Sequence, residues 1–370
     1  MKKIIGIAVA GLAAIAMSQA VVTTAGAQDI DPALQASWDY MQEQMPGVPY
    51  SLLTAACAEG EVMVYHGSWA DAEDLQIQGF NKRFPCLTVR KLGGGMSDIR
   101  ERFLAEYRAG LKVADLVQDS SSAVLDEHAK AGYLSEYTIS NDDKFADDAK
   151  HTGYWYSMRR GMAGIAWNTD LVSDEDAAKL TEWEGILDPR WKDVAAVGDI
   201  SAGGVAYLPF YAWYQLYGDE FYKKLGELNV RNIAGTNNAA AALASGDVEV
   251  LFNASETALV PLYNKGAPIK WSLPPPGVGP LTGQSITSNA PHPNAARLFQ
   301  EYTFSEEGYG LFQSLGGVPT RIGTPDAREV AAEPWYKVPA EMFVFDEKEA
   351  NEAVPMILEK FNEYVGTARN

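Results

Sequence analysis

Short apolar strands alternate with amphipathic helices along the chain, and this alternation limits the possible folds more than any other feature. A strand is predicted at residues 61–65 and a helix at 71–84. Two further pairs follow: strand 87–92 with helix 98–109, and strand 114–117 with helix 122–131. Strands that are each followed by a helix indicate a mainly parallel sheet covered by helices on both faces.

The alternation resumes after residue 163, which indicates a second sheet. The predicted elements are strands at 164–168, 193–200 and 248–253 and helices at 205–216 and 221–228. Residues 273–280, rich in proline and glycine, suit neither a helix nor a central strand and predict a connector between lobes. Helices are expected again at 294–303 and 306–315. The predicted fold class is therefore α/β, with two lobes that each contain a mainly parallel sheet flanked by helices.

The first 27 residues have the three parts of a secretory signal peptide. Lys2 and Lys3 precede an apolar run at 4–17, and the small residues Ala25-Gly26-Ala27 follow. The apolar run is shorter than the ~20 residues of a membrane helix, so we expect cleavage before Gln28 and release into the periplasm. An uncleaved anchor is the alternative, and the polar residues after position 22 disfavour it.

Cleavage would leave 343 residues, more than a single core usually organises. We expect a first lobe at 28–160, a second lobe at 161–278, and a return to the first lobe with C-terminal helices at 279–370. The first crossing between lobes is expected at 158–163. The net charge of −19 becomes −21 once the two leading lysines are removed. This charge argues against a nucleic-acid partner, because phosphate contacts require clusters of Lys and Arg. A monomer is expected.

Cys57 and Cys86 are the two cysteines of the chain, and export would place them in an oxidising compartment. They flank the predicted strand 61–65, and Cys86 directly precedes the strand 87–92. If these strands are parallel neighbours, both cysteines lie at the same edge of the sheet and a disulfide is possible. Two buried free thiols are the alternative, and the sequence leaves both open.

The turns that follow the predicted strands are small, polar and able to start a helix. In open parallel sheets a ligand binds outside the carboxyl ends of the strands, so these turns are the candidate site. Glycine lets the backbone approach a ligand, serine hydroxyls donate hydrogen bonds, and the N–H groups of a helix start attract negative charge. Ordinary helix capping is the alternative for any single turn. The candidate residues are His66, Ser68, Trp69, Gly94, Gly95, Ser120, Ser121, Ser201, Gly203, Gly204, Ser255 and Glu256.

Several segments resemble the extracellular solute-binding proteins of ABC importers, particularly the branch that contains ferric-binding proteins. The resemblance covers nearly the whole mature chain, and the turn Asn168-Thr169-Asp170 is one of its more specific motifs. The segments that carry it are 61–65, 114–117, 131–134, 164–172 and 290–299. The resemblance implies two α/β lobes of the type II periplasmic binding fold, joined by hinge strands. The lobes would close over one solute and deliver it to an inner-membrane permease.

The iron-binding members of that family use a histidine, a carboxylate and an adjacent tyrosine pair, and this chain departs from each. Trp69 falls where the histidine would lie and Ser120 where the carboxylate would lie. Residues 254–256, Ala-Ser-Glu, fall near the tyrosines. Fe(III) prefers phenolate and carboxylate oxygens, so we expect neither a metal nor a cofactor. A small anionic or polar solute, such as a phosphonate, a phosphate ester or a carboxylate, is expected instead, and ferric iron remains the alternative.

Arg159 and Arg160 are the best cationic partners for an anion, because a guanidinium binds such groups in a bidentate manner. We expect at most one of them to face the solute, and Arg159 is the one taken as a candidate. Trp69 would lie over a ring or apolar part of the solute or cover a cationic part, or else pack in the core. Glu256 is expected to face solvent as a helix cap; if it points inward, it indicates an amino group on the solute.

No catalytic motif is present, so an enzyme is not expected. His128 and His151 are predicted to lie among surface residues, and neither accompanies a Gly-x-Ser-x-Gly elbow. Asp71, Glu73 and Asp74 are interpreted as the solvated face of an amphipathic helix. An exported hydrolase and a polyamine receptor remain distant alternatives.

Overall fold

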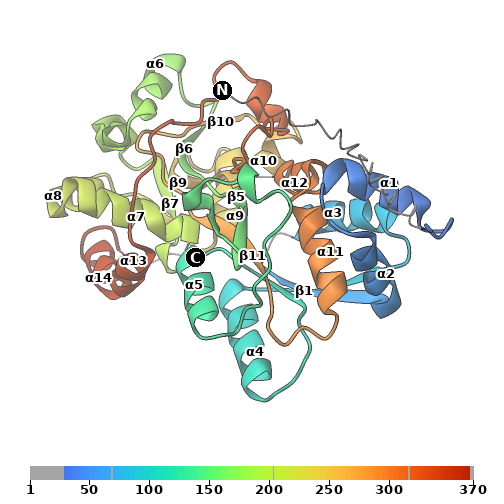
Figure 1. Cartoon of the computed structure of the whole chain (residues 1–370). Helices are drawn as coiled ribbons and strands as arrows, with labels where there is room; N and C mark the ends of the chain where they lie inside the picture. Colours follow the sequence, from blue (N-terminus) through green and yellow to red (C-terminus); the bar gives the residue numbers. More distant parts are fainter. Residues whose placement is uncertain (1–28, 68–69, 203, 316, 367–370) are drawn as a thin grey trace, which may run out of the picture. The chain divides into compact units, whose positions relative to one another are not determined.

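The computed structural model describes residues 29–67, 70–202, 204–315 and 317–366. The predicted signal peptide therefore lies outside the described residues, and so do Ser68, Trp69 and Gly203. The chain divides after Gln35 into two units. In the first, residues 29–35 contain a turn in which the amide of Ala33 donates to Asp31 Oδ1 at 2.9 Å. Both sheets belong to the second unit (Figure 1).

The first sheet has the strand order β2-β1-β3-β11-β5-β4. Strands β1, β2 and β3 run parallel, whereas β11 is antiparallel to both β3 and β5. We call this sheet and its helices the first lobe. The strands are β1 (Glu61–His66), β2 (Thr88–Gly93), β3 (Leu116–Asp119), β4 (Lys150–His151), β5 (Trp155–Arg160) and β11 (Leu281–Ile286). The helices are α1 (Gln35–Gln44), α2 (Tyr50–Glu59), α3 (Ala70–Arg83), α4 (Met96–Arg108), α5 (Ser122–Lys130), α11 (Pro293–Thr303) and α12 (Glu306–Gln313).

The second sheet has the strand order β10-β6-β9-β7-β8, and we call it and its helices the second lobe. Its strands are β6 (Ala163–Asn168), β7 (Ala195–Gly198), β8 (Arg231–Ile233), β9 (Val250–Ser255) and β10 (Ile269–Ser272). Its helices are α6 (Asp174–Ala177), α7 (Gly204–Tyr217), α8 (Asp219–Glu227), α9 (Thr236–Ala244) and α10 (Glu256–Tyr263).

Two C-terminal helices, α13 (Glu347–Glu352) and α14 (Val354–Tyr364), lie beside α7 and α8 (Figure 1). Tyr207 donates a hydrogen bond to the carbonyl of Ala350 at 2.7 Å, and Lys360 pairs with Asp219. Ile357 and Phe361 of α14 are buried in the same aromatic core as Trp213. The end of the chain therefore packs on the second lobe.

The α/β fold with two sheets is confirmed, and every strand and helix predicted above occurs within two residues of its expected ends. The sheets are mixed rather than mainly parallel, because β11 and β6 are antiparallel to the strands on either side of them. Each of these strands begins at a point where the chain arrives from the other lobe, so it runs against its neighbours. The predicted connector at 273–280 joins β10 of one sheet to β11 of the other.

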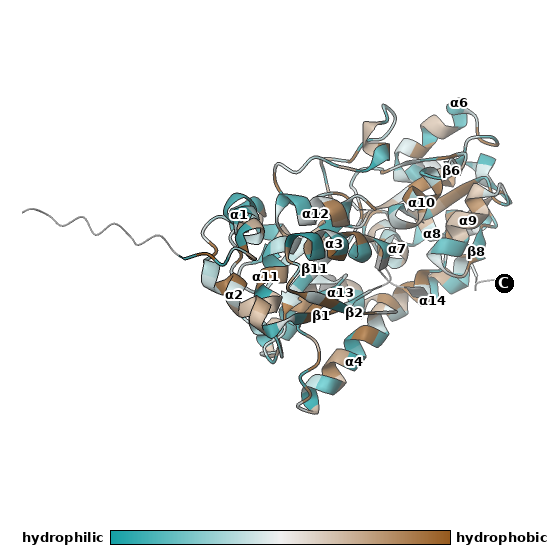
Figure 2. Cartoon of the chain, turned by 90° about the vertical axis from the view of Figure 1, so that its right-hand side faces the viewer, coloured by the Kyte–Doolittle hydropathy of each residue, from teal (hydrophilic) through white to brown (hydrophobic). Residues whose placement is uncertain are grey.

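The helices are amphipathic, and their apolar faces form the core. Figure 2 shows hydrophilic and hydrophobic residues side by side along α4, where Ile99 and Phe103 are buried and the charged residues at 101 and 102 are exposed. The core of the second lobe is rich in aromatic rings; Phe210 packs edge-on against Trp213 at 4.7 Å and against Phe361 at 5.0 Å. Complete burial of one such ring contributes about 1.5–3 kcal/mol.

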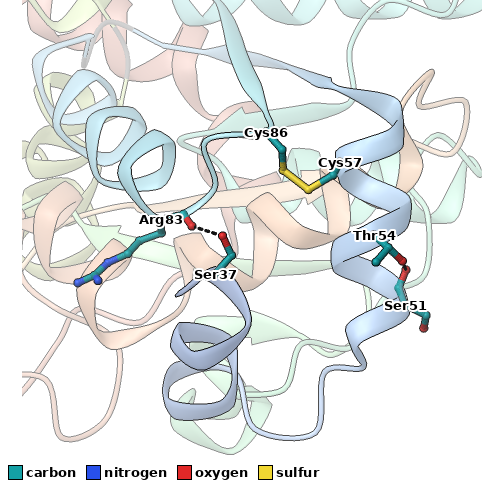
Figure 3. Close-up of a disulfide and its surroundings, with 6 residues drawn as sticks. All are labelled: Ser37, Ser51, Thr54, Cys57, Arg83 and Cys86. Carbon is teal, nitrogen blue, oxygen red and sulfur yellow. Dashed lines mark hydrogen bonds between the residues drawn. A yellow bond between two sulfur atoms is a disulfide. The ribbon is translucent and has the colours of Figure 1, made fainter. Parts of the chain in front are cut away.

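A disulfide joins Cys57 to Cys86, which resolves the choice that the sequence left open (Figure 3). The two Cα atoms lie 5.3 Å apart, because β1 and β2 are parallel neighbours with Glu61 opposite Thr88. Nearby, Ser37 Oγ donates to the carbonyl of Arg83 at 2.7 Å (Figure 3). The disulfide therefore links α2 to the segment directly before β2, at the sheet edge opposite the candidate turns.

Candidate functional site

The carboxyl ends of β1, β2 and β3 lie at one edge of the first sheet. His66 is opposite Gly93, and Tyr65 is opposite Val117, so the carboxyl ends of the three parallel strands are aligned. β5 ends at the same edge, since its last residue, Arg160, is opposite the first residue of β11. The chain leaves the first sheet at this point.

The second sheet presents a matching edge where the chain enters it. Ala163, the first residue of β6, is opposite Ser255, the last residue of β9. Asn253 fixes the neighbouring turn: its Oδ1 accepts from the amide of Gly198 at 2.7 Å, and its Nδ2 donates to the carbonyls of Gly198 and Ala206. The turns after β7 and β9 therefore lie at the edge where the chain arrives.

The two edges are joined by a pair of crossing segments, 160–163 and 278–281. The amide of Gly161 donates to the carbonyl of Pro280 at 2.9 Å, and the amide of Ala163 donates to that of Val278 at 2.8 Å. The segments approach so closely that a Cβ on Gly279 would lie 1.7 Å from the carbonyl oxygen of Gly161. These crossings bring the two sets of turns together, and we call this region the crossing edge.

His66 lies at the crossing edge and is buried. A Cβ on Gly93 would lie 2.5 Å from its ring, so glycine provides the space for the imidazole. Burial, with a smaller effect from Lys91, lowers the pKa of His66 below its ordinary 6.5. Among the described residues its Nδ1 has no hydrogen-bond partner. His66 is therefore a buried histidine at the end of β1, not a solvent-exposed turn residue.

The turn after β3 combines helix capping with an ion pair that the sequence analysis missed. Ser121 Oγ accepts from the amide of Val124 at 3.4 Å, and the Ser121 amide donates to Asp119 Oδ1 at 2.9 Å. Arg100 donates to both oxygens of Asp119, at 2.9 and 2.8 Å. Ser120 is half-buried beside this pair. Ser121 is therefore the N-cap of α5, and its hydroxyl oxygen already accepts one hydrogen bond from that helix.

The other turn candidates occupy helix starts with different exposure. Gly95 is the N-cap residue of α4, directly after Gly94, and Gly204 begins α7. Ser201 is exposed, and its amide donates to Asp199 Oδ1 at 2.9 Å. Ser255 is buried, with its Oγ 2.8 Å from Thr257 Oγ1.

Glu256 does not face solvent, contrary to the sequence-based expectation, because it is completely buried. Arg328 Nη1 donates to its Oε2 at 3.0 Å. Its Oε1 accepts from Trp271 Nε1 at 2.9 Å and from the hydroxyl of Tyr336 at 2.7 Å. Its partners are 15 to 80 residues away in the sequence, so the local pattern did not reveal them.

Arg159 is buried at the crossing edge, whereas Arg160 is half-buried and lies 3.4 Å from Asp148. The guanidinium of Arg159 stacks over the ring of Phe312 at 5.3 Å, and its side chain passes close to Gly317. Burial, together with the charge of Arg328, lowers the pKa of Arg159 to about 10. Arg159 thus stays cationic at neutral pH.

A hollow of about 420 Å³ opens beside the start of α5 and contains mixed charges. In it, Asp126 Oδ1 lies 2.8 Å from His151 Nδ1 and accepts from Trp155 Nε1 at 2.8 Å. The lining residues are Ser122, Asp126, Asp147, Asp148, Lys150, His151, Thr152 and Trp155. In the described part of the chain, no group of three or more His, Cys, Asp or Glu side chains is placed to hold a metal ion.

Two further expectations are corrected by the packing. His128 is buried, not on the surface, with its ring 5.6 Å from Phe103, and burial lowers its pKa to about 4. Glu73 is completely buried between exposed Asp71 and Asp74, so the three carboxylates do not form one solvated face. In both cases a residue distant in the sequence covers the side chain: Gln118 contacts Glu73, and Phe103 contacts His128.

The fold is shared with solved periplasmic binding proteins. Iron-bound HitA from Pseudomonas aeruginosa is 19% identical, covers 81% of this chain and 99% of its own, and has a TM-score of 0.67. AfuA from Actinobacillus pleuropneumoniae, solved with fructose-6-phosphate, is 18% identical, covers 84% of this chain and 99% of its own, and has a TM-score of 0.61. The ferric-binding protein of Campylobacter jejuni is 14% identical, covers 82% of this chain and 99% of its own, and has a TM-score of 0.64.

None of the described helices is long and apolar enough to cross a membrane. No curated protein matches the chain. The bacterial extracellular solute-binding proteins, by contrast, match residues 112–339, which is more than half of the chain and includes both crossings. The chain therefore belongs to the family of bacterial extracellular solute-binding proteins.

Proposed function

We propose that the chain is the periplasmic receptor of an ABC importer and captures a small anionic or polar organic solute at the crossing edge. The observation that carries this proposal is the meeting of polar turns from both sheets around the paired crossing segments. A solute held there would contact both lobes at once. Because a ligand shifts two conformations only by its differential affinity, such contacts would favour closure of the hinge.

The charge pattern supports an anion or a polar group in preference to a metal. Arg159 supplies a buried positive charge at the crossing edge, and the charge of Glu256 is compensated by Arg328. Helix starts at α4, α5 and α7 add N–H donors, each contributing about 0.3–1 kcal/mol towards an anion. Phosphonates, phosphate esters and carboxylates have the acceptor oxygens that these groups need. AfuA, with its sugar phosphate, has the same fold.

Ferric iron is the second candidate, because iron-bound HitA and the Campylobacter ferric-binding protein share the fold. Against it, residues 254–256, Ala-Ser-Glu, fall near the positions of the tyrosine ligands, and Glu256 is engaged internally. Ser68, Trp69 and Gly203 remain proposed contacts of the solute. The same proposal includes the predicted signal peptide, the predicted lobe boundaries and a monomeric state.

The test is a thermal-shift screen of the purified mature chain against fructose 6-phosphate, methylphosphonate, citrate, spermidine and ferric citrate. A solute at 100 times its Kd stabilises the folded state by about 2.7 kcal/mol, so one of the first three is expected to raise Tm. Ferric citrate is expected to give no visible phenolate absorption band. A Tm rise with ferric citrate accompanied by that band would replace the proposal with the iron candidate.

Substitution of the β3 turn tests where the solute binds. Ser120→Ala with Ser121→Ala is expected to weaken binding of the solute found in the screen. Loss of the Ser121 cap should also lower the free energy of unfolding by about 1 kcal/mol. The cap control is Ser305→Ala, which removes the N-cap of α12 away from the candidate turns. Equal affinity in the double variant and in the parent chain would remove this turn from the site.

A further inference from the structure

A further segment, 318–336, passes from the first lobe to the second. At its beginning the amide of Val318 donates to the carbonyl of Arg160, and Thr320 Oγ1 donates to Ser157 Oγ at 3.0 Å, so it is attached to β5. At its end Val330 and Tyr336 are buried in the core of the second lobe, and the ring of Trp335 lies 5.3 Å from that of Trp271. The change of lobe therefore occurs near residues 326–330.

Arg328 lies at this change of lobe and is the centre of a buried ion cluster. On one side, its Nε and Nη2 donate to Asp326, at 2.8 and 2.5 Å. On the other side, Nη1 donates to Glu256 at the start of α10, and Nη2 donates to the hydroxyl of Tyr336 at 2.6 Å. Both partners of the Arg328–Glu256 pair have completely buried side chains. Burial by itself lowers the pKa of Arg328, but Asp326 and Glu256 outweigh it and raise the pKa above the ordinary 12.5.

The cluster is anchored in the first lobe through Gln313, the last residue of α12. Its Nε2 donates to Asp326 Oδ1 at 2.8 Å, and its Oε1 accepts from the amide of Ala327 at 3.1 Å. In the second lobe, Trp271 of β10 closes the cluster by donating to Glu256. A continuous chain of hydrogen bonds thus runs from α12 to β10 through Asp326, Arg328 and Glu256.

This chain also reaches the candidate solute site. The amide of Glu256 donates to the carbonyl of Met162 at 3.0 Å, which ties the start of α10 to the first crossing segment. Ser255, a candidate contact of the solute, is the preceding residue. A buried ion pair is weak support for stability but fixes geometry, because a displaced charge would lose its partner in a low-dielectric interior.

We propose that Arg328 is a positioning residue for the solute site: by bridging Asp326 and Glu256 it fixes the start of α10 against the crossings and so sets the angle between the lobes. The inference rests on the proposed function only in placing the solute at the crossing edge. The lobe angle itself is measurable without any solute.

The experiment measures the distance between the lobes in the full mature chain. Nitroxide labels on Lys130→Cys of α5 and Lys224→Cys of α8 report this distance, and the native cysteines do not react because they form the disulfide. Pulsed electron paramagnetic resonance of the solute-free parent is expected to give one narrow distance distribution. Arg328→Met is expected to broaden it or to add a second population, with the circular dichroism spectrum unchanged.

Arg190→Met is the matched control, because Arg190 also bridges two carboxylates, Asp176 and Glu249, but within the second lobe. Its distance distribution is expected to equal that of the parent. An unchanged distribution in folded Arg328→Met overturns the proposal. If Arg328→Met does not fold, Tyr336→Phe decides: it removes one bond to Glu256, so a smaller broadening supports the role and an unchanged distribution overturns it.

The two proposals fail separately. Absence of any stabilising solute in the thermal-shift screen would reject the receptor function and leave the distance result standing. An unchanged lobe distance would reject the role of Arg328 and leave the receptor function standing. Once a solute is identified, Arg328→Met is also expected to weaken its binding, whereas Arg190→Met is not.

Discussion

Glu73 in the first lobe and Glu256 in the second are both completely buried, and these two carboxylates differ in their partners. Glu256 in the second lobe meets the guanidinium of Arg328, an indole N–H and a tyrosine hydroxyl. Glu73 in the first lobe accepts from Gln118 Nε2 at 2.9 Å, and its Oε1 has no hydrogen-bond partner among the described residues. Burial raises the pKa of Glu73 to about 7. Equal burial thus produces a compensated charge in one lobe and a titratable acid in the other.

The comparison illustrates that hydrogen-bond and ion-pair partners offset the cost of burying an acid. An unpaired carboxylate in a low-dielectric interior takes up a proton, whereas a paired one stays ionised and holds its surroundings in place. The lobe that contains the disulfide contains the uncompensated acid. The lobe that holds the C-terminal helices contains the ion cluster.

The largest expected change in the free energy of unfolding comes from removing the cation that pairs with Glu256. Arg328→Met removes the guanidinium and leaves Glu256 and Asp326 without their cation. Because breaking a buried pair by removing one partner exposes an uncompensated charge, the free energy of unfolding is expected to fall by about 3–5 kcal/mol. Urea unfolding at pH 8 measures this loss. The partly exposed pairs of Arg190 should make Arg190→Met cost less than about 1 kcal/mol, and equal losses in the two variants would contradict the comparison.

The next effect comes from removing the charge of Glu73. The folded-state pKa of about 7 lies above the ordinary 4.5, so the folded chain binds this proton more tightly than the unfolded chain does. The stabilisation is complete below about pH 4.5 and is lost as the pH rises through 7. Glu73→Gln is therefore expected to be more stable than the parent by roughly 3 kcal/mol at pH 8 and similar to it at pH 4.

The measurement is the free energy of unfolding of Glu73→Gln and of the parent as a function of pH. The difference between the two proteins reports on Glu73 alone, because His66 and His128 titrate in both. Lys91 and Asp74 are the charged neighbours of Glu73; Lys91 lowers its pKa and Asp74 raises it. A pH-independent difference between the two proteins would show that Glu73 is not the titrating acid. Asp74→Asn removes the neighbouring charge that raises the pKa of Glu73, so it is expected to move the pH at which this difference levels off to a lower value.

The smallest effect is expected at the single hydrogen bond that Glu73 receives. Gln118→Met keeps the side-chain size but removes the donor to the charged form, so the pKa of Glu73 should rise further by about one unit. To measure this shift, the free energies of unfolding of Gln118→Met and of the double variant Gln118→Met/Glu73→Gln are compared over pH. The pH at which their difference levels off reports the pKa of Glu73. Gln284→Met is the control, because Gln284 contacts Gln118, Gln300 and Thr303 but not Glu73. A downward shift, or an equal shift in the control, would contradict the assignment.

Much of the fold was predictable because it depends on local signals. The strand at 61–65 and the helix at 71–84 carry their own periodicity, and the small and polar residues that follow position 65 in the sequence separate them. The alignment of the carboxyl ends of β1, β2 and β3, where the solute site is proposed, was predictable for the same reason. The sequence analysis did not predict that β5 and β11 pair in the first sheet. Their composition does not indicate that β11 is antiparallel to both of its neighbours.

The roles of single polar residues were the least predictable part. Glu73, Glu256 and His128 all look like surface positions in a helical pattern, and all three are buried. Each is covered by a segment distant in sequence: Glu73 meets Gln118, Glu256 meets Arg328, and His128 packs against Phe103. Arg328 gave no signal at all, because the residues that surround it are brought together only by the third passage of the chain between lobes.

The order of strands and helices, the resemblance to solute receptors and the polar turns at the strand ends follow from the amino-acid sequence by itself, since each depends on residues close together in the chain. The tertiary structure alone decided which acids are paired, which histidines are neutral and which cation bridges the lobes. The physical reason is that a charge state depends on desolvation and on partners within a few ångströms, and those partners come from segments that only folding brings together.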